Sequence, residues 1–189
     1  MNLPNVLTVS RLFFAIVLIV LLEEKSSLGN ILAVIVFTIA SLTDFYDGYL
    51  AKKQGLISDF GKIMDPIADK ALMLSVFGVF AHIGVIAWWI FIIIAFREVV
   101  VTASRLQAMQ KGQVLAAERA GKIKTVVQIV AVSVILLFLV AQQSELCSSW
   151  FENVKSTWHL INQGILILAI ILTVYSGFDY FQNKAKAGS

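Results

Sequence analysis

Long apolar runs separated by short polar stretches dominate this sequence from end to end. The first run covers Leu12–Leu22, directly after Arg11. Five more runs follow it, at residues 30–51, 63–82, 85–109, 121–142 and 158–180. Each of these five is close to the ~20 residues that a helix needs to cross a bilayer. No strand-type alternation interrupts the pattern, so it predicts an all-α, polytopic membrane protein with six transmembrane helices.

The two ends of the chain are more polar than the runs between them. Residues 1–10 are too short to span a bilayer, and their apolar positions predict a short N-terminal interfacial helix. Residues 182–189 are expected to form a cytoplasmic tail. The first apolar run has the positive start of a signal peptide but no small-residue cleavage site, so we expect a retained span. The whole chain, residues 1–189, is therefore expected to be a single membrane domain.

Composition supports the membrane interpretation. The chain has 189 residues, of which 59% are hydrophobic and 14% are charged, and its mean hydropathy is +0.85. A soluble domain carries roughly 25% charged residues. The single cysteine, Cys147, excludes an internal disulfide and a cysteine-based metal site. Basic residues are sparse and interleaved with apolar runs, which gives no support to nucleic-acid binding.

Positive charges are distributed unevenly between the two sides that six spans would create. All Lys and Arg residues except Lys25 and Lys155 fall on the side that holds both termini and the polar stretches at 52–62 and 110–124. Cytoplasmic segments carry an excess of positive residues, so we expect both termini to be cytoplasmic in a bacterial-type inner or plasma membrane. The four tryptophans fall at the opposite interface, as an aromatic belt would.

Four aspartates gather around the polar stretch between the second and third spans. Asp44 and Asp47 end the second span, and Asp65 and Asp69 begin the third. Spacings of three and four residues place the side chains of each pair on one face of a helix. Carboxylates at close quarters repel one another unless cations neutralise them, and hard divalent ions prefer oxygen ligands. We therefore expect a cytoplasm-facing cavity with two divalent ions; the alternative is a turn with ordinary solvated acids.

The same window, DFYDGYLAKKQGLISDFGKIMDPIAD, resembles the signature of the CDP-alcohol phosphotransferase family. Every signature position matches except Lys52, where the family usually has Arg. The resemblance implies six transmembrane helices, usually in a homodimer, and Mg²⁺ or Mn²⁺ as cofactor. It also implies transfer of a phosphatidyl-type group from a CDP-linked donor to an alcohol, with release of CMP. In that pattern Asp44, Asp47, Asp65 and Asp69 hold the two metals, and Asp69 is also the general base on the acceptor hydroxyl.

Small residues follow the first aspartate pair along the second span. Gly48 and Ala51 would let a nucleotide approach the helix backbone, although small residues serve close helix packing equally well. The resemblance favours the nucleotide. Lys52 is a candidate contact for the diphosphate, but Lys presents a point charge where Arg presents a bidentate fork, so its role stays open. The resemblance also implies that Asn5, Thr8 and Arg11 lie at the nucleotide end of the cavity.

Basic residues in the fourth and fifth spans bear on the acceptor. Arg97 falls near the middle of the fourth span, where a charge is costly unless it is paired or functional, and Arg105 lies further along the same helix. Lys122 and Lys124 open the fifth span. All four are candidate ligands for an acceptor phosphate. The alternatives are an ion pair with an acid inside the bundle for Arg97 and positive-inside anchoring for the two lysines.

Three further segments, NLPNVLTVSR, FREVVVTASR and GKIKT, resemble the phosphatidylglycerophosphate synthases within that family. This resemblance implies CDP-diacylglycerol as the donor and sn-glycerol 3-phosphate as the acceptor. One alternative is a sister enzyme with another alcohol, such as inositol phosphate or serine. Another is a cation transporter, in which intramembrane acids would line an ion path. The acids cluster at one helix mouth and no repeated halves are visible, which favours the enzyme. A catalytically inactive scaffold is disfavoured because all four aspartates are present.

Overall fold

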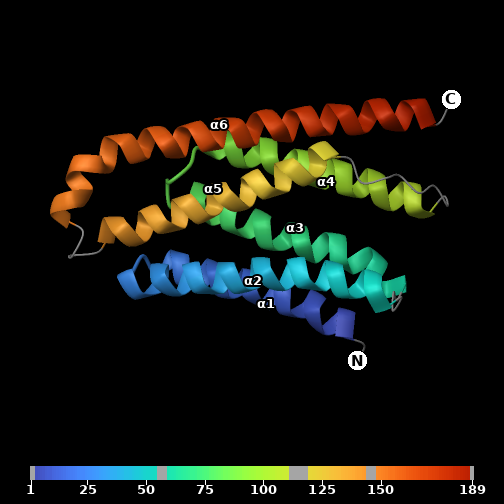
Figure 1. The fold of residues 1–189 in the computed structure, drawn as a ribbon, viewed down its shortest axis with the longest axis horizontal. Helices are drawn as coiled ribbons and strands as arrows, with labels where there is room; N and C mark the ends of the chain where they lie inside the picture. Colours follow the sequence, from blue (N-terminus) through green and yellow to red (C-terminus); the bar gives the residue numbers. More distant parts are fainter. Residues whose placement is uncertain (1–2, 55–58, 111–118, 144–147, 188–189) are drawn as a thin grey trace.

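Six α-helices make up the described part of the chain in this computed structural model, and they run back and forth along a common direction (Figure 1). The backbone is described for residues 3–54, 59–110, 119–143 and 148–187, and side chains for residues 9–43, 67–68, 70–108, 121–143 and 155–184. The helices are α1 (Leu3–Glu23), α2 (Ser27–Gln54), α3 (Asp59–His82), α4 (Trp88–Gln110), α5 (Arg119–Gln143) and α6 (Ser148–Ala187). An all-α fold with six helices in the predicted order is therefore confirmed.

Two helix boundaries differ from the sequence prediction. The short interfacial helix expected over residues 1–10 is not a separate element, because α1 continues without a break to Glu23. No glycine or proline stands at the junction to end the helix, and Pro4 lies in the first turn, where its missing N–H costs little. At the other end of the chain, α6 is 40 residues long and ends at Ala187, so most of the expected tail is helical.

The bundle is built from contacts between helices that are neighbours in the chain and others that are not. The helix α1 packs against α2 and α3, and α2 also packs against α5. The helix α4 packs against α3 and α6, while α6 also packs against α5. Large apolar side chains fill the interior, among them Leu18, Phe37, Val76, Phe80 and Leu136.

Apolar side chains also cover outward-facing surfaces. On α6, for example, Ile171, Val174 and Phe178 are exposed. Helices that are apolar on all sides are typical of membrane spans or of a large buried core. Among the described residues, Gly121–Gln143 and Lys155–Lys184 are long and apolar enough to cross a membrane, judged by length and composition. Two helical segments, Ser27–Thr43 and Lys70–His82, are apolar but shorter.

The connection between α1 and α2 is tight for local reasons. The Oγ atom of Ser26 accepts a hydrogen bond from the backbone N–H of Gly29 at 2.9 Å, which caps the start of α2. A Cβ at position 29 would lie 2.6 Å from the carbonyl oxygen of Leu21, so only glycine permits this close approach. The buried Asn30 donates to Oε1 of Gln143 at 3.0 Å, which ties the end of α5 to this turn.

The opposite end of the bundle gathers the segments that the sequence analysis placed together. The C-terminal turns of α2 and the N-terminal turns of α3 meet there, on the right of Figure 1. The start of α1, the end of α4, the start of α5 and the end of α6 lie at this same end (Figure 1). We call it the aspartate end, because residues 44–54 of α2 and 59–69 of α3 form part of it.

Candidate functional site

The four aspartates lie on the two helices that meet at the aspartate end. Asp44 and Asp47 belong to the C-terminal half of α2, and Asp65 and Asp69 belong to the N-terminal half of α3. Their side chains lie outside the described residues, so their convergence on metal ions stays a prediction. Among the side chains that are described, no group of three or more His, Cys, Asp or Glu residues could hold a metal ion.

The candidate nucleotide residues lie near the same end of the bundle. Asn5 and Thr8 occupy the first turns of α1, and Gly48, Ala51 and Lys52 occupy the last turns of α2. The side chains of these five residues also fall outside the described set. The backbone therefore brings the helical turns together, and the contacts that these residues make stay a prediction.

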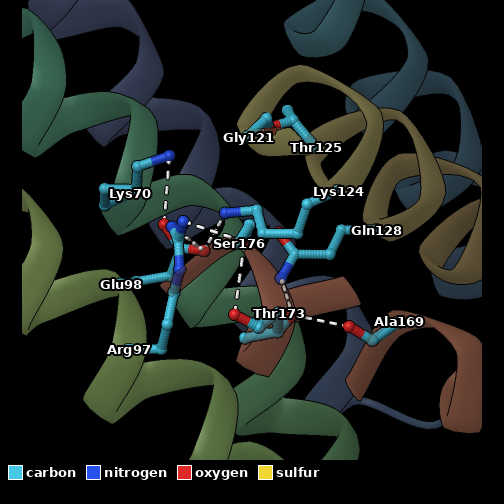
Figure 2. Close-up of polar contacts among 10 residues, drawn as sticks. All are labelled: Lys70, Arg97, Glu98, Gly121, Lys124, Thr125, Gln128, Ala169, Thr173 and Ser176. Atoms are coloured by element: carbon cyan, nitrogen blue, oxygen red, sulfur yellow. Dashed lines mark hydrogen bonds and ion pairs between the residues drawn. The ribbon is translucent and has the colours of Figure 1, made fainter. Parts of the chain in front are cut away.

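A buried carboxylate with three basic neighbours lies inside the bundle (Figure 2). The side chain of Glu98, on α4, is 2% exposed. Its Oε1 accepts a hydrogen bond from Nζ of Lys124 on α5, and its Oε2 lies 3.2 Å from Nζ of Lys70 on α3. Arg97 completes the group, with its Nη1 atom 3.5 Å from Oε1. We call these four residues the Glu98 cluster.

The Glu98 cluster is anchored to α6 as well. The Nη2 atom of Arg97 donates a hydrogen bond to Oγ of Ser176 at 2.9 Å, and Ser176 in turn donates to the carbonyl oxygen of Thr173 at 3.2 Å. Nearby, the Nε2 atom of Gln128 donates to Oγ1 of Thr173 at 3.3 Å (Figure 2). Polar side chains on α3, α4, α5 and α6 are thus joined at one level of the bundle.

Close packing holds the stem of Arg97 against α6. A Cβ at Gly177 would lie 3.2 Å from Cγ of Arg97 and 3.7 Å from its Nε. Glycine leaves room there for the arginine side chain to pass along α6 toward Ser176. The conformation of Arg97 is therefore fixed at its stem by Gly177 and at its guanidinium by Ser176 and Glu98.

The Glu98 cluster brings several like charges together inside the bundle. Within the described side chains it contains three cations that share one carboxylate. Burying charge is costly unless it is paired and hydrogen-bonded. The shared carboxylate of Glu98 therefore offsets part of the cost of burying these basic groups together.

A second group of polar side chains lies between α4 and α6, further toward the aspartate end. The Oγ atom of Ser104 accepts hydrogen bonds from Tyr180 at 3.3 Å and from Nζ of Lys184 at 2.6 Å. The guanidinium of Arg105 stacks over the ring of Tyr180, with Cζ 5.4 Å from the ring centroid. Arg105 is therefore oriented by an aromatic ring rather than by Glu98.

The four candidate ligands of the acceptor phosphate are thus placed differently. Arg97 and Lys124 meet at Glu98, and the ion pair considered for Arg97 is present. Arg105 lies about 12 Å from Arg97 along the helix axis, given a rise of 1.5 Å per residue. Lys122 is exposed, whereas Lys124 is almost fully buried.

Sequence reasoning missed three parts of this arrangement. Glu98 was visible as an acid in the middle of a span, but its contacts with Lys70 and Lys124 depend on how α3 and α5 pack against α4. Ser176 and Gly177 carry no signal of their own in an apolar helix. The sequence signal for Lys70 was its position directly after Asp69, a candidate metal ligand.

Comparison with known proteins gives one consistent result. A family model described as CDP-alcohol phosphatidyltransferase matches residues 1–177. A Bacillus subtilis (strain 168) protein named CDP-diacylglycerol–glycerol-3-phosphate 3-phosphatidyltransferase is 35% identical, covering 98% of this chain and 96% of its own length. A Rickettsia bellii protein of the same name is 34% identical, with coverage of 98% and 96%. A Mycobacterium tuberculosis protein named probable phosphatidylglycerophosphate synthase is 34% identical, with coverage of 98% and 82%.

Proposed function

Because the chain belongs to the CDP-alcohol phosphatidyltransferase family, we propose that it transfers the phosphatidyl group of CDP-diacylglycerol to sn-glycerol 3-phosphate. The products are phosphatidylglycerophosphate and CMP. The observation that carries this proposal is the likeness over nearly the full length to relatives whose names state this donor and this acceptor. The basic residues of the Glu98 cluster offer hydrogen-bond donors of the kind that bind a phosphate, which supports an acceptor that itself carries one.

The proposed setting is the membrane that contains the lipid donor. All six helices are taken to span it, with both termini and the aspartate end on the cytoplasmic side of a bacterial-type inner or plasma membrane. The uneven distribution of Lys and Arg supports this orientation. The arrangement in Figure 1 is compatible with it, since the start of α1, the end of α6 and the facing ends of α2 and α3 lie at one end of the bundle.

The donor atoms at the aspartate end fit a pair of Mg²⁺ or Mn²⁺ ions. Asp44, Asp47, Asp65 and Asp69 offer carboxylate oxygens, which are the ligands that hard divalent ions prefer. The helical turns that carry them meet at one end of the bundle (Figure 1). Bound there, two divalent ions would offset the negative charge of the diphosphate and of the departing CMP.

The reaction requires one bond to form, one to break and one proton to move. The acceptor hydroxyl oxygen attacks the phosphorus that carries the diacylglycerol, and the bond from that phosphorus to the oxygen of CMP breaks. Asp69 takes the hydroxyl proton as general base. The bridging oxygen leaves with CMP, so no redox partner is needed.

The remaining candidate residues bind and orient the two substrates. Arg97 and Lys124 hold the acceptor phosphate, and each contributes charge-assisted hydrogen bonds. Arg105 and Lys122 extend the positive region toward the cytoplasm. Binding of the phosphate at the level of the Glu98 cluster brings the acceptor to α3 beside Lys70, the residue that follows Asp69.

The nucleotide lies along the backbone of α2 in this scheme. Gly48 and Ala51 leave room for it, Lys52 contacts the diphosphate, and Asn5 and Thr8 line the cytidine end. The family resemblance also implies a homodimer. A dimer would cover part of the exposed apolar surface, and crosslinking in membranes would test it.

A panel of acceptors tests the proposed function directly. Purified protein is supplied with CDP-diacylglycerol, Mg²⁺ and one alcohol at a time, and CMP release is followed. We expect turnover with sn-glycerol 3-phosphate and none with serine or inositol phosphate. Turnover with another alcohol and none with glycerol 3-phosphate would indicate a sister enzyme with a different acceptor. Metal flux across vesicles without any CMP release would favour a transporter.

A further inference from the structure

We propose that Glu98 is a positioning residue for the acceptor phosphate, a role that rests on the proposed function. Its carboxylate holds Arg97 and Lys124 in convergent positions and connects them to Lys70 on α3. Glu98 does not touch the reacting atoms in this scheme. It fixes the positions of Arg97 and Lys124, which bind the phosphate, relative to the turn of α3 that carries the general base Asp69.

The contacts of Glu98 use both of its oxygen atoms. Oε1 is shared by Lys124 and Arg97, while Oε2 faces Lys70 at 3.2 Å. The three basic residues come from α3, α4 and α5, so one carboxylate joins three helices. A group that is 2% exposed and surrounded by cations is not available to take a proton from an alcohol. Its place in the fold therefore points to an organising role rather than to acid–base chemistry.

Electrostatics explain why these cations need an acid between them. Three positive side chains that converge inside a bundle repel one another, and the repulsion is only weakly screened away from water. Without the carboxylate, the long flexible lysine side chains would separate and turn toward solvent. With it they stay together. The acceptor phosphate then meets basic groups that are already gathered, and each can donate a charge-assisted hydrogen bond to it.

The contact with Lys70 connects this cluster to the catalytic helix. Lys70 directly follows Asp69 in the sequence of α3. Fixing Lys70 on Glu98 therefore fixes one turn of α3 relative to Arg97 and Lys124. When Arg97 and Lys124 bind the phosphate of glycerol 3-phosphate, the hydroxyl of the same molecule would lie at a constant distance from that turn of α3.

Substitutions of Glu98 separate positioning from general stability. Glu98→Gln removes the negative charge but preserves the size of the side chain, and Glu98→Asp preserves the charge. Gln128→Ala is the matched control, because Gln128 is buried in the same bundle and donates to Thr173 without touching Glu98. Each protein is purified in detergent, checked by thermal unfolding, and assayed for CMP release with each substrate varied in turn.

We expect Glu98→Gln to raise the KM for glycerol 3-phosphate by about tenfold or more, since charge-assisted hydrogen bonds are lost from an organised site. The KM for CDP-diacylglycerol should stay within about twofold of the wild-type value, because the nucleotide residues are on other helices. Glu98→Asp should lie between wild type and Glu98→Gln for the acceptor, and Gln128→Ala should leave both KM values close to wild type.

Several results would overturn the positioning role. An unchanged or lower KM for glycerol 3-phosphate in Glu98→Gln would contradict it, and so would an equal change in Gln128→Ala. If Glu98→Gln does not fold, Glu98→Asp decides: a selective rise in the acceptor KM supports the role, and no rise contradicts it. A wild-type protein that is inert with glycerol 3-phosphate would instead refute the proposed function, which keeps the two failures distinct.

Discussion

A single added methyl group at position 177 would test the role of Arg97 without changing any charge. Gly177 lies on α6 beside Ser176, and a Cβ there would stand 3.2 Å from Cγ of Arg97 and 3.7 Å from Nε. Carbon atoms in favourable contact are separated by about 3.5–4.0 Å, so Cγ would have to move by at least about 0.3 Å. The guanidinium is held by Ser176 at 2.9 Å, and its distance to Glu98 is already 3.5 Å.

The displacement acts on a side chain that has little freedom to adjust. Overpacking in a well-packed interior costs about 1–3 kcal/mol when side chains must shift. Arg97 can relieve part of this cost by moving away from its phosphate-binding position. If that movement weakens binding of the acceptor phosphate by about 0.7–1.4 kcal/mol, the KM for glycerol 3-phosphate rises about three- to tenfold. The KM for CDP-diacylglycerol should change much less, because Arg97 is not among the candidate nucleotide residues.

Gly164→Ala provides the matched control on the same helix. A Cβ at Gly164 meets no atom within 4 Å, so the substitution adds the same methyl group in open space. Alanine is favoured over glycine in a helix interior by about 1 kcal/mol, so thermal stability should not fall. Initial rates of CMP release, measured with each substrate varied, give the two KM values for both variants. A KM for glycerol 3-phosphate in Gly177→Ala that equals the value in Gly164→Ala would refute this account of Arg97.

Four further predictions concern the metal site, the diphosphate and the basic residues. Asp65→Ala and Asp69→Ala should each reduce CMP release to background while the protein still elutes as a folded species in size-exclusion chromatography; retained activity in either would contradict the site. Removal of divalent ions with a chelator should stop turnover and added Mg²⁺ or Mn²⁺ should restore it, whereas activity in the chelator would exclude a metal-dependent reaction. Lys52→Arg should retain activity, since it restores the usual residue of the family, and a severe loss would indicate a specialised local geometry. Lys124→Met should raise the KM for glycerol 3-phosphate more than Lys122→Met, because Lys124 is buried on Glu98 and Lys122 is exposed; the reverse order would contradict the placement of the phosphate.

The number, order and type of the helices could be predicted from the sequence because five of the six apolar runs are about as long as a membrane span and most are bounded by charged residues. The ends of the helices were less predictable. Residues 1–10 are polar enough to suggest a separate interfacial element, yet nothing at Ser10 or Arg11 breaks the helix, and α1 continues through them. The polar composition of the tail likewise conceals its helical structure up to Ala187.

The candidate site, like the fold, could be predicted from the sequence only in part. The aspartate spacing is local information within two helices, so it could be detected in the sequence, although the aspartate side chains are outside the described residues. The Glu98 cluster depends on contacts between residues far apart in the chain, such as Lys70 with Glu98 and Arg97 with Ser176. Apolar periodicity does not specify which faces of α3, α4, α5 and α6 meet. A single sequence therefore left open whether Arg97 was paired, functional or both.

Formation of the lipid product tests the central claim most directly. Purified protein would receive CDP-diacylglycerol, Mg²⁺ and glycerol 3-phosphate labelled in its carbon atoms, and the label in the lipid phase would be compared with the CMP released. The account predicts one labelled lipid for each CMP, and neither product in Asp69→Asn. Release of CMP without transfer of the label to lipid, or full activity in Asp69→Asn, would contradict it.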